Sequence, residues 1–251
     1  MAVYRGLDVG TAKPTAADRA AVPHHCVDLV PPSASFSVAD WLAAAAAAMA
    51  SCRARGKGIL FVGGTPLYLR ALRDGIADLP SAAPAIRAAL TSVAAREGSA
   101  ALHRRLSTID PSAASRIHPN DTKRLVRALE VAELTGRPLS AAFAPAADPL
   151  FESRLMILDV GRRELAGRID RRVEAMFAGG IVEETAEALA TPGGIGPTAG
   201  QAAGYGEAIG LLAGRINRAE AIRRTQVRTR QLAKRQRTWF RSFKQATWIG
   251  C

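Results

Sequence analysis

The chain has 251 residues, of which 48% are hydrophobic and 5% aromatic, a formal net charge of +12, and no apolar run near the ~20 residues of a membrane span. These values exclude a membrane-spanning protein and are typical of a globular one with an α/β domain and a smaller second domain. Three widely spaced cysteines, and first residues without the apolar segment of a signal peptide, favour a reducing cytoplasm and argue against a disulfide framework or a zinc site.

Residues 1–78 predict an α/β core with a mainly parallel sheet. An alanine-rich helix is expected from a capping-box start at Ser37 and Asp40 to about Ala54. Three short apolar segments are strand candidates, and the last of them reads as buried: residues 3–4, 26–30 and 59–62. Because strand, helix and strand follow one another at this spacing, we expect a βαβ unit.

The turn after the third strand candidate has the chemistry of a ligand site. Gly63 and Gly64 let the backbone turn without a Cβ clash, Thr65 can cap a new helix, and Pro66 fits the first position of that helix. Phosphorylated ligands bind at such carboxyl ends of strands in open α/β sheets. From these residues alone, a ligand-binding turn and an ordinary βα turn capped by Thr65 both stay open.

Residues 79–150 predict a helical insertion without strands. Helices are expected over residues 85–97 and 100–106, from residue 111, and from 121 to 134. Three cations, Lys123, Arg124 and Arg127, lie in the first turns of the fourth helix, where the helix dipole favours acids. They therefore either bind an anion or form a solvated face together with Glu130.

Residues 151–251 predict a return to the α/β core that ends in a basic helix. Strands are expected over 151–160 and 247–249, with helices over 162–178, 181–190, 199–212 and 218–243. From Arg215 to Lys244, eleven lysines and arginines accompany one acid, Glu220, so this segment carries +10 of the net charge. Such localised charge favours a polyanion, above all nucleic acid, over a merely solvated face.

Other motifs are weak or absent. His24, His25 and Asp28 invite a metal-site interpretation, but adjacent histidines point in different directions, and we favour structural roles and expect no protein-bound metal cluster. The printed sequence contains neither a Walker A loop nor a defensible Ser-His-Asp or Cys-His arrangement.

Several segments match one family in order along nearly the whole chain. They are residues 3–14, 23–25, 36–40, 62–65, 67–72, 118–121, 127–131 and 204–205, and Arg-Gln-Leu-Ala-Lys-Arg-Gln at 230–236. Together these segments resemble the tRNA dimethylallyltransferases, also called tRNA isopentenyltransferases or IPP transferases, in their bacterial form.

The resemblance implies a fold and an activity. The fold is α/β, a P-loop NTPase/kinase-like parallel sheet flanked by helices, with a helical insertion domain. The activity is transfer of a dimethylallyl group from dimethylallyl diphosphate to N6 of adenosine 37, next to the anticodon, in tRNAs that read codons beginning with U. Mg²⁺ assists the departure of diphosphate. The implied partners are the anticodon stem-loop of tRNA and dimethylallyl diphosphate, and we expect a cytoplasmic monomer without membrane contact.

The resemblance also implies site residues. Thr65 matches a threonine of the channel in which the adenine amine meets the diphosphate, so we assign it to catalysis and diphosphate binding. Contacts with tRNA are implied at Met1, Ala2, Arg87, Lys123, Arg124, Leu125, Val126, Arg127, Gln201, Ala202, Ala203, Gly204, Tyr205 and Gly206. For Arg230, Lys234 and Arg235 of the basic helix, phosphate contact is inferred from charge.

The sequence departs from the family pattern at several positions. Met1 aligns with an internal methionine of the family motif Asp-Ser-Met-x-Val-Tyr, so we expect the phosphate loop and the aspartate base to precede it, with about 35 residues or one βα unit missing. We therefore expect the chain as written to be inactive or nearly so. Pro66 replaces a usual glycine, and Gly206 replaces a usual lysine or arginine.

Two alternatives to an active transferase remain. The first is a catalytically dead tRNA-binding remnant of the same family, which keeps the basic helix. The second is a relative of small-molecule P-loop kinases, which the basic helix disfavours.

Overall fold

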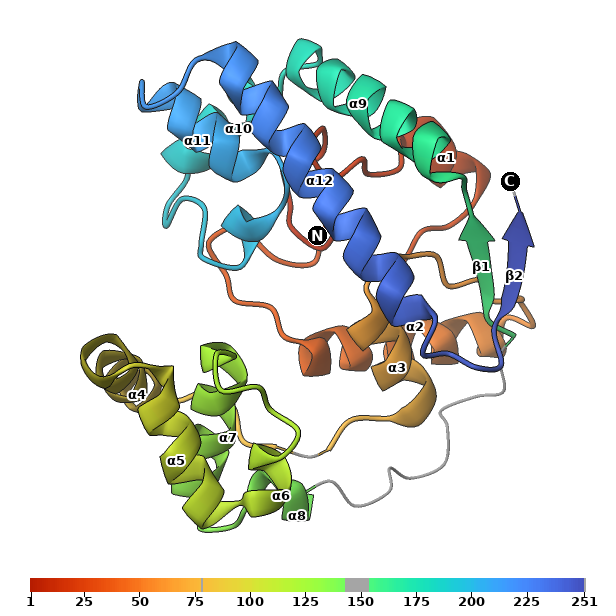
Figure 1. The fold of residues 1–251 in the computed structure, drawn as a ribbon. Helices are drawn as coiled ribbons and strands as arrows, with labels where there is room; N and C mark the ends of the chain where they lie inside the picture. The colour runs from red at the N-terminus through yellow and green to blue at the C-terminus, as the bar shows by residue number, and fades with distance from the viewer. Residues whose placement is uncertain (78, 143–153, 251) are drawn as a thin grey trace. The chain divides into compact units, whose positions relative to one another are not determined.

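The computed structural model describes residues 1–77, 79–142 and 154–250 (Figure 1). These form two compact units, one of Met1–Ala71 with Glu152–Cys251 and the other of Leu72–Phe151. The second unit begins inside helix α3 (Pro66–Asp74), whereas we expected the insertion to begin at residue 79. Its other expected boundary, at residues 150–151, lies outside the described residues. The structure is mixed α/β and mostly helical.

The first thirty residues form loops around a buried lysine. The Nζ of Lys13 lies 2.5 Å from the carbonyl oxygen of Tyr4 and 2.5 Å from a carboxylate oxygen of each of Asp8 and Asp28. The Lys13 side chain is 2% exposed. A short helix that we did not predict, α1 (Ala16–Ala21), follows this cluster. One ammonium group therefore forms hydrogen bonds to three residues of a segment that has little regular secondary structure.

The strand candidates of the first sixty residues do not form regular strands. Two of them contribute a parallel bridge between Tyr4 and Val30. The third, residues 59–62, pairs with no other strand in the described part of the chain, and its Leu60 and Val62 side chains are 78% and 87% exposed. The predicted buried strand and βαβ unit are wrong for this structure, because an apolar run becomes a strand only where neighbouring strands satisfy its backbone groups.

The described residues form a parallel pair of strands near the end of the chain. Strand β1 (Met156–Asp159) pairs with β2 (Thr247–Gly250), and Met156 lies opposite Thr247. Both predicted strands and their parallel direction are confirmed, although residues 151–153 lie outside the described residues. Leu158 is 68% exposed, so one face of this pair is open.

Most helices of the first unit begin and end as the sequence predicts. Ser37 and Asp40 form the expected capping box of α2. The predicted helix 199–212 is interrupted, because Gly204 has a φ of +101° and separates the 3₁₀ turn η1 from α11. The helices are α2 (Val38–Ala54), α9 (Arg162–Ala178), α10 (Ile181–Ala190), η1 (Ala199–Gln201), α11 (Tyr205–Leu212) and α12 (Arg218–Phe240).

Helix α12 runs along α9 and α11, as Figure 1 shows. It contributes Ala221 and Thr225 to the buried interior, next to a core that includes Val173, Phe177 and Tyr205. The buried residues of α12 are small, so the helix packs closely while its long cationic side chains stay at the surface. This packing presents the basic side of α12 to solvent.

The second unit is a group of helices around its own core. The core centres on the buried residues Leu90, Leu102, Leu106, Leu125 and Leu129. Its helices are α4 (Pro84–Glu97), α5 (Ser99–Ile109), α6 (Pro111–Ala114), α7 (Thr122–Thr135) and α8 (Leu139–Ala142). The four predicted helices are present, and α8 is an addition. The side chains of Asp110 and Asp121 cap α6 and α7, because they accept hydrogen bonds from the first turns of these helices.

Candidate nucleic-acid interface

Thr65 stands at the start of α3. Its carbonyl oxygen accepts the N–H groups of Tyr68 at 3.0 Å and Leu69 at 3.2 Å, so α3 begins at the predicted place, but the Thr65 side chain does not form the predicted cap. The residue is exposed, and within the described residues its hydroxyl has no hydrogen-bond partner. Because the hydroxyl is not used by the cap, it can contact a ligand.

The turn that precedes Thr65 is attached to α12. The side-chain amide of Gln236 donates to the carbonyl oxygen of Gly64. A Cβ built on Gly64 would overlap that amide, so a larger residue at position 64 would displace the Gln236 side chain. One turn of α3 further on, the Arg70 guanidinium lies 5.1 Å from the ring centroid of Trp239 at the end of α12. The Thr65 turn therefore lies beside the carboxyl-terminal half of the basic helix.

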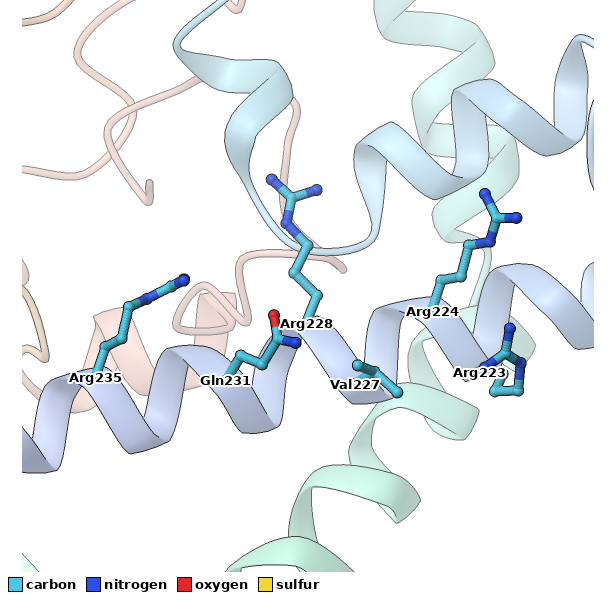
Figure 2. A pocket seen from close by; sticks show the side chains of 6 residues that line it. All are labelled: Arg223, Arg224, Val227, Arg228, Gln231 and Arg235. Carbon is cyan, nitrogen blue, oxygen red and sulfur yellow. The ribbon is translucent and has the colours of Figure 1, made fainter. Parts of the chain in front are cut away.

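The basic side of α12 lines a cavity of about 480 Å³ (Figure 2). Of the three predicted phosphate contacts, Lys234 and Arg235 are exposed and form no hydrogen bond or ion pair by their side chains within the described residues. Arg230 instead lies 2.5 Å from a carboxylate oxygen of Asp170. The lining residues are Arg223, Arg224, Val227, Arg228, Gln231 and Arg235.

Sequence reasoning assigned a phosphate contact to Arg235 but to none of the other lining residues, although all of them lie within the basic segment 215–244. Arg224, Arg228, Gln231 and Arg235 are separated by four, three and four residues, the spacing of one helix face. That spacing is a signal that the sequence already contains. Which face of α12 stays exposed depends on packing against distant helices, and for that reason the pattern alone did not select these residues.

The residues of the predicted contact segment 201–206 differ in burial. Ala202, Gly204 and Tyr205 are buried, whereas Gln201 is exposed. The Tyr205 hydroxyl donates to Glu184 at 2.6 Å, and burial together with this carboxylate raises the pKa of the Tyr205 phenol. In this structure the Tyr205 side chain is a structural group.

The rest of the segment lies next to α12. The carbonyl oxygen of Gln201 accepts a hydrogen bond from Arg228 at 2.8 Å, and Ala203 and Gly206 are half-buried. At the start of the chain, Met1 is exposed and Ala2 is half-buried. The implied RNA contacts of these residues remain predictions.

The cations predicted in the second unit divide into two pairs. Lys123 and Arg124 are exposed on the first turn of α7. Arg127 and Arg87 instead donate to Glu130, at 2.7 and 2.8 Å, and the Glu130 side chain is 0% exposed. Burial alone would raise the pKa of Glu130, but these two arginines hold it below its usual value. Glu130 therefore stabilises Arg87 and Arg127, whereas Lys123 and Arg124 are exposed, and Arg124 lies 3.3 Å from a carboxylate oxygen of Asp121.

Leu125 and Val126 are part of the core of the second unit. Both side chains are buried on α7, with 0% and 7% of their surface exposed. A contact between these side chains and RNA is incompatible with this conformation, because the same atoms pack against the neighbouring helices. Within the matched segment 123–127, the exposed residues are thus Lys123 and Arg124, and their RNA contacts remain predictions.

The side chains and helices of the described ranges also bear on metal binding and on membrane crossing. These ranges contain no group of three or more His, Cys, Asp and Glu side chains that could hold a metal ion. The Nδ1 of His24 lies 2.7 Å from the Val22 carbonyl oxygen, whereas the Nε2 of His25 lies 3.7 Å from the Sγ of Cys52. The two imidazole rings therefore contact different parts of the chain. Among the described helices, none combines the length and apolar character that a membrane crossing needs.

Comparison with protein families gives a match over nearly the whole chain. A family model described as IPP transferase matches residues 2–243. The tRNA dimethylallyltransferase of Anaeromyxobacter dehalogenans strain 2CP-C is 49% identical over 250 residues, which cover 99% of this chain and 83% of that protein.

Solved structures show the same likeness. The full-length tRNA isopentenylpyrophosphate transferase of Bacillus halodurans superposes with a TM-score of 0.67 at 38% identity, over 99% of this chain and 78% of that one. A eukaryotic dimethylallyltransferase, described as acting on tRNA, gives a TM-score of 0.80 at 24% identity, over 100% of this chain and 65% of that one. The latter shares the fold.

Proposed function

Since the chain belongs to the IPP transferase family, we propose that it serves the transfer of a dimethylallyl group from dimethylallyl diphosphate to N6 of adenosine 37, next to the anticodon of tRNA. The acceptors are tRNAs that read codons beginning with U, and diphosphate is released. We further propose that the protein acts in the cytoplasm and as a monomer. Sedimentation of the purified protein with and without RNA would test the oligomeric state.

The observation that carries this proposal is the hydrogen bond from Gln236 to the carbonyl oxygen of Gly64. It attaches the Thr65 turn to α12, the most basic of the described helices. A transferase that modifies a nucleotide must bind the RNA backbone and hold the reacting groups within one short distance. The hydrogen bond between the Thr65 turn and α12 supports the proposal, because it brings a candidate reaction site next to a cationic surface.

The proposed chemistry needs few groups from the protein. The N6 nitrogen forms a bond to the primary allylic carbon while the bond from that carbon to the diphosphate oxygen breaks, and N6 then loses a proton. Thr65 would orient the amine or a diphosphate oxygen through its hydroxyl. Lys234 and Arg235 would hold RNA phosphates. We assign the acceptor of the N6 proton to no described residue.

Mg²⁺ belongs to the proposal as a companion of the diphosphate. Mg²⁺ commonly keeps several waters and binds substrate phosphates with one or two protein ligands. The described residues form no cage of three or more potential ligands, so we assign the ion to the substrate and no step to it. Its chemical contribution there would be to neutralise the charge of the leaving diphosphate.

The test is a transfer assay that uses labelled dimethylallyl diphosphate and an anticodon stem-loop. It is made on the chain as printed and on the chain preceded by a family segment that carries the phosphate loop and Asp-Ser. In the extended protein, Thr65→Ala should lower the transfer rate about a hundredfold. RNA affinity should be unchanged, and Thr65→Ser should retain most of the activity.

The outcomes separate the alternatives. Transfer by the printed chain at the rate of the extended one would contradict our expectation that the printed chain is inactive. RNA binding without transfer in both proteins would favour the RNA-binding remnant. If neither protein binds the stem-loop, the proposed function is wrong.

A further inference from the structure

Three guanidinium groups and one amide form a row on α12. Arg224, Arg228, Gln231 and Arg235 all line the cavity of about 480 Å³. Figure 2 shows the three arginines leaving the helix on the same side. From the first to the last, the row extends about 16 Å along the helix axis, at 1.5 Å per residue.

Arg228 is held in the middle of this row by η1 and by the first turn of α11. Its Nη2 donates to the carbonyl oxygen of Gln201 at 2.8 Å, and its Nη1 lies 3.3 Å from a carboxylate oxygen of Glu207. A guanidinium has five N–H donors, so these contacts orient the group and leave donors for a ligand. Arg228 is half-buried, and the ordering is therefore present before any ligand binds.

The guanidinium of Arg228 also occupies the space next to Gly206. A Cβ built on Gly206 would lie 3.4 Å from Nη1 of Arg228 and 3.7 Å from the carbonyl oxygen of Gly200. Gly206 lies in the first turn of α11 without a positive φ, so its backbone accepts other residues. A long side chain at position 206 would enter the region that the Arg228 side chain now fills.

We propose that the row Arg224, Arg228 and Arg235 binds consecutive phosphate groups of the RNA strand, with Arg228 supplying from α12 the cation that stands beside Gly206. This inference rests on the proposed function, and it specifies which groups of the RNA are held and by which residues. It adds Arg224 and Arg228 to the residues that the sequence singled out.

The shape of the cavity favours a strand over a small anion. All its lining residues come from α12, so it is a groove along one helix. Pockets for small ligands enclose most of the ligand surface, which a groove on one helix does not. A polymer that follows the helix can contact all three arginines in succession.

The charge of the groove is positive even with its acids included. Glu207 faces Arg228, and Glu220 lies 2.5 Å from Arg224 and 2.7 Å from Arg223. The Arg235 side chain forms no ion pair within the described residues. Four arginines against two carboxylates leave a field that attracts phosphate.

The first experiment measures binding of an anticodon stem-loop over a range of salt concentrations. Arg228→Ala should weaken binding about tenfold at low salt. It should also lower the slope of log affinity against log salt by about one. Arg163→Ala, which removes an exposed charge from the first turn of α9, is the matched control and should change affinity less than twofold.

The second experiment moves the cation across the groove. In the double variant Gly206→Arg with Arg228→Ala, a guanidinium returns to the same place from α11. Affinity and salt slope should recover to within about threefold of the unchanged protein, because the phosphate again meets a cation there. Circular dichroism melting curves of each variant check that the fold is kept, and Arg228→Gln, which preserves length and polarity, replaces Arg228→Ala if the latter unfolds.

Four results would contradict the inference. The first is unchanged RNA affinity and slope in Arg228→Ala and Arg228→Gln. The second is a loss of inorganic diphosphate binding in these variants while RNA binding is kept, which would assign the groove to a small anion. The third is absence of RNA binding by the unchanged protein, which would refute the proposed function as well. A double variant no tighter than Arg228→Ala would contradict the shared position of the two side chains.

Discussion

Glu130 is a fully buried carboxylate whose charge is balanced by Arg87 and Arg127. It also accepts the backbone N–H of Ala83 at 2.7 Å. Removing one partner of a buried ion pair leaves charge without compensation. We expect Glu130→Gln to lower the free energy of unfolding by about 3 kcal/mol, measured by urea denaturation at pH 7.

The pH dependence of that loss follows from the pKa of Glu130, which lies below its usual value in the folded protein. A carboxylate with a depressed folded pKa stabilises the fold above its unfolded pKa of about 4.3, and this contribution disappears as pH falls through the folded pKa. The stability difference between the unchanged protein and Glu130→Gln should therefore shrink below about pH 4. A difference that stays constant from pH 7 to pH 3 would contradict this account.

Helix α12 begins with a side-chain cap, and an acid in its first turn forms ion pairs with two of its arginines. The Asn217 side chain accepts the N–H of Glu220, and Glu220 in turn accepts hydrogen bonds from Arg223 and Arg224. These bonds lower the pKa of Glu220 to about 2, so it is ionised throughout the range of RNA-binding assays. We expect Glu220→Gln to tighten stem-loop binding about threefold at low salt and to have the same effect at pH 5.5 and pH 8. Weaker binding would show that Glu220 holds the two arginines in a productive position.

The contrast between helices and strands shows what the sequence could predict. The starts of α2 and α7 were predictable because Ser37 and Asp121 cap the turn that follows them, within three residues. Residues 59–62 were not, because a strand depends on partners elsewhere in the chain. The interruption of 199–212 at Gly204 needed knowledge of packing, since a Cβ there would lie 2.6 Å from Ile181.

The candidate site was predictable in its composition and less so in its geometry. The charge of α12 and the position of Thr65 were evident from the sequence. Arg230 pairs with Asp170, which is 60 positions away in the sequence, and Arg237 pairs with Asp159, which is 78 positions away. Such pairings decide which cations are available to RNA, and no local pattern contains them.

At the scale of the whole molecule, several large aliphatic side chains are exposed to solvent. Leu60, Val62, Met156 and Leu158 are all exposed, although their segments have the composition of buried strands. Exposed apolar surface of this kind binds hydrophobic dyes and promotes association. We expect the printed chain to enhance the fluorescence of anilinonaphthalene sulfonate, and the pair Val62→Lys with Leu158→Lys to reduce that signal by about half. An unchanged signal in the double variant would locate the dye elsewhere.

The reactivity of the buried Lys13 ammonium group reports how often the segment around it opens. Lys57, Lys123, Lys234 and Lys244 are exposed, whereas Lys13 is enclosed by Tyr4, Asp8 and Asp28. An acylating reagent should therefore modify Lys13 last, at a rate governed by how often the first thirty residues detach from the body. Mass spectrometry of partly acylated protein would follow that rate at a single atom.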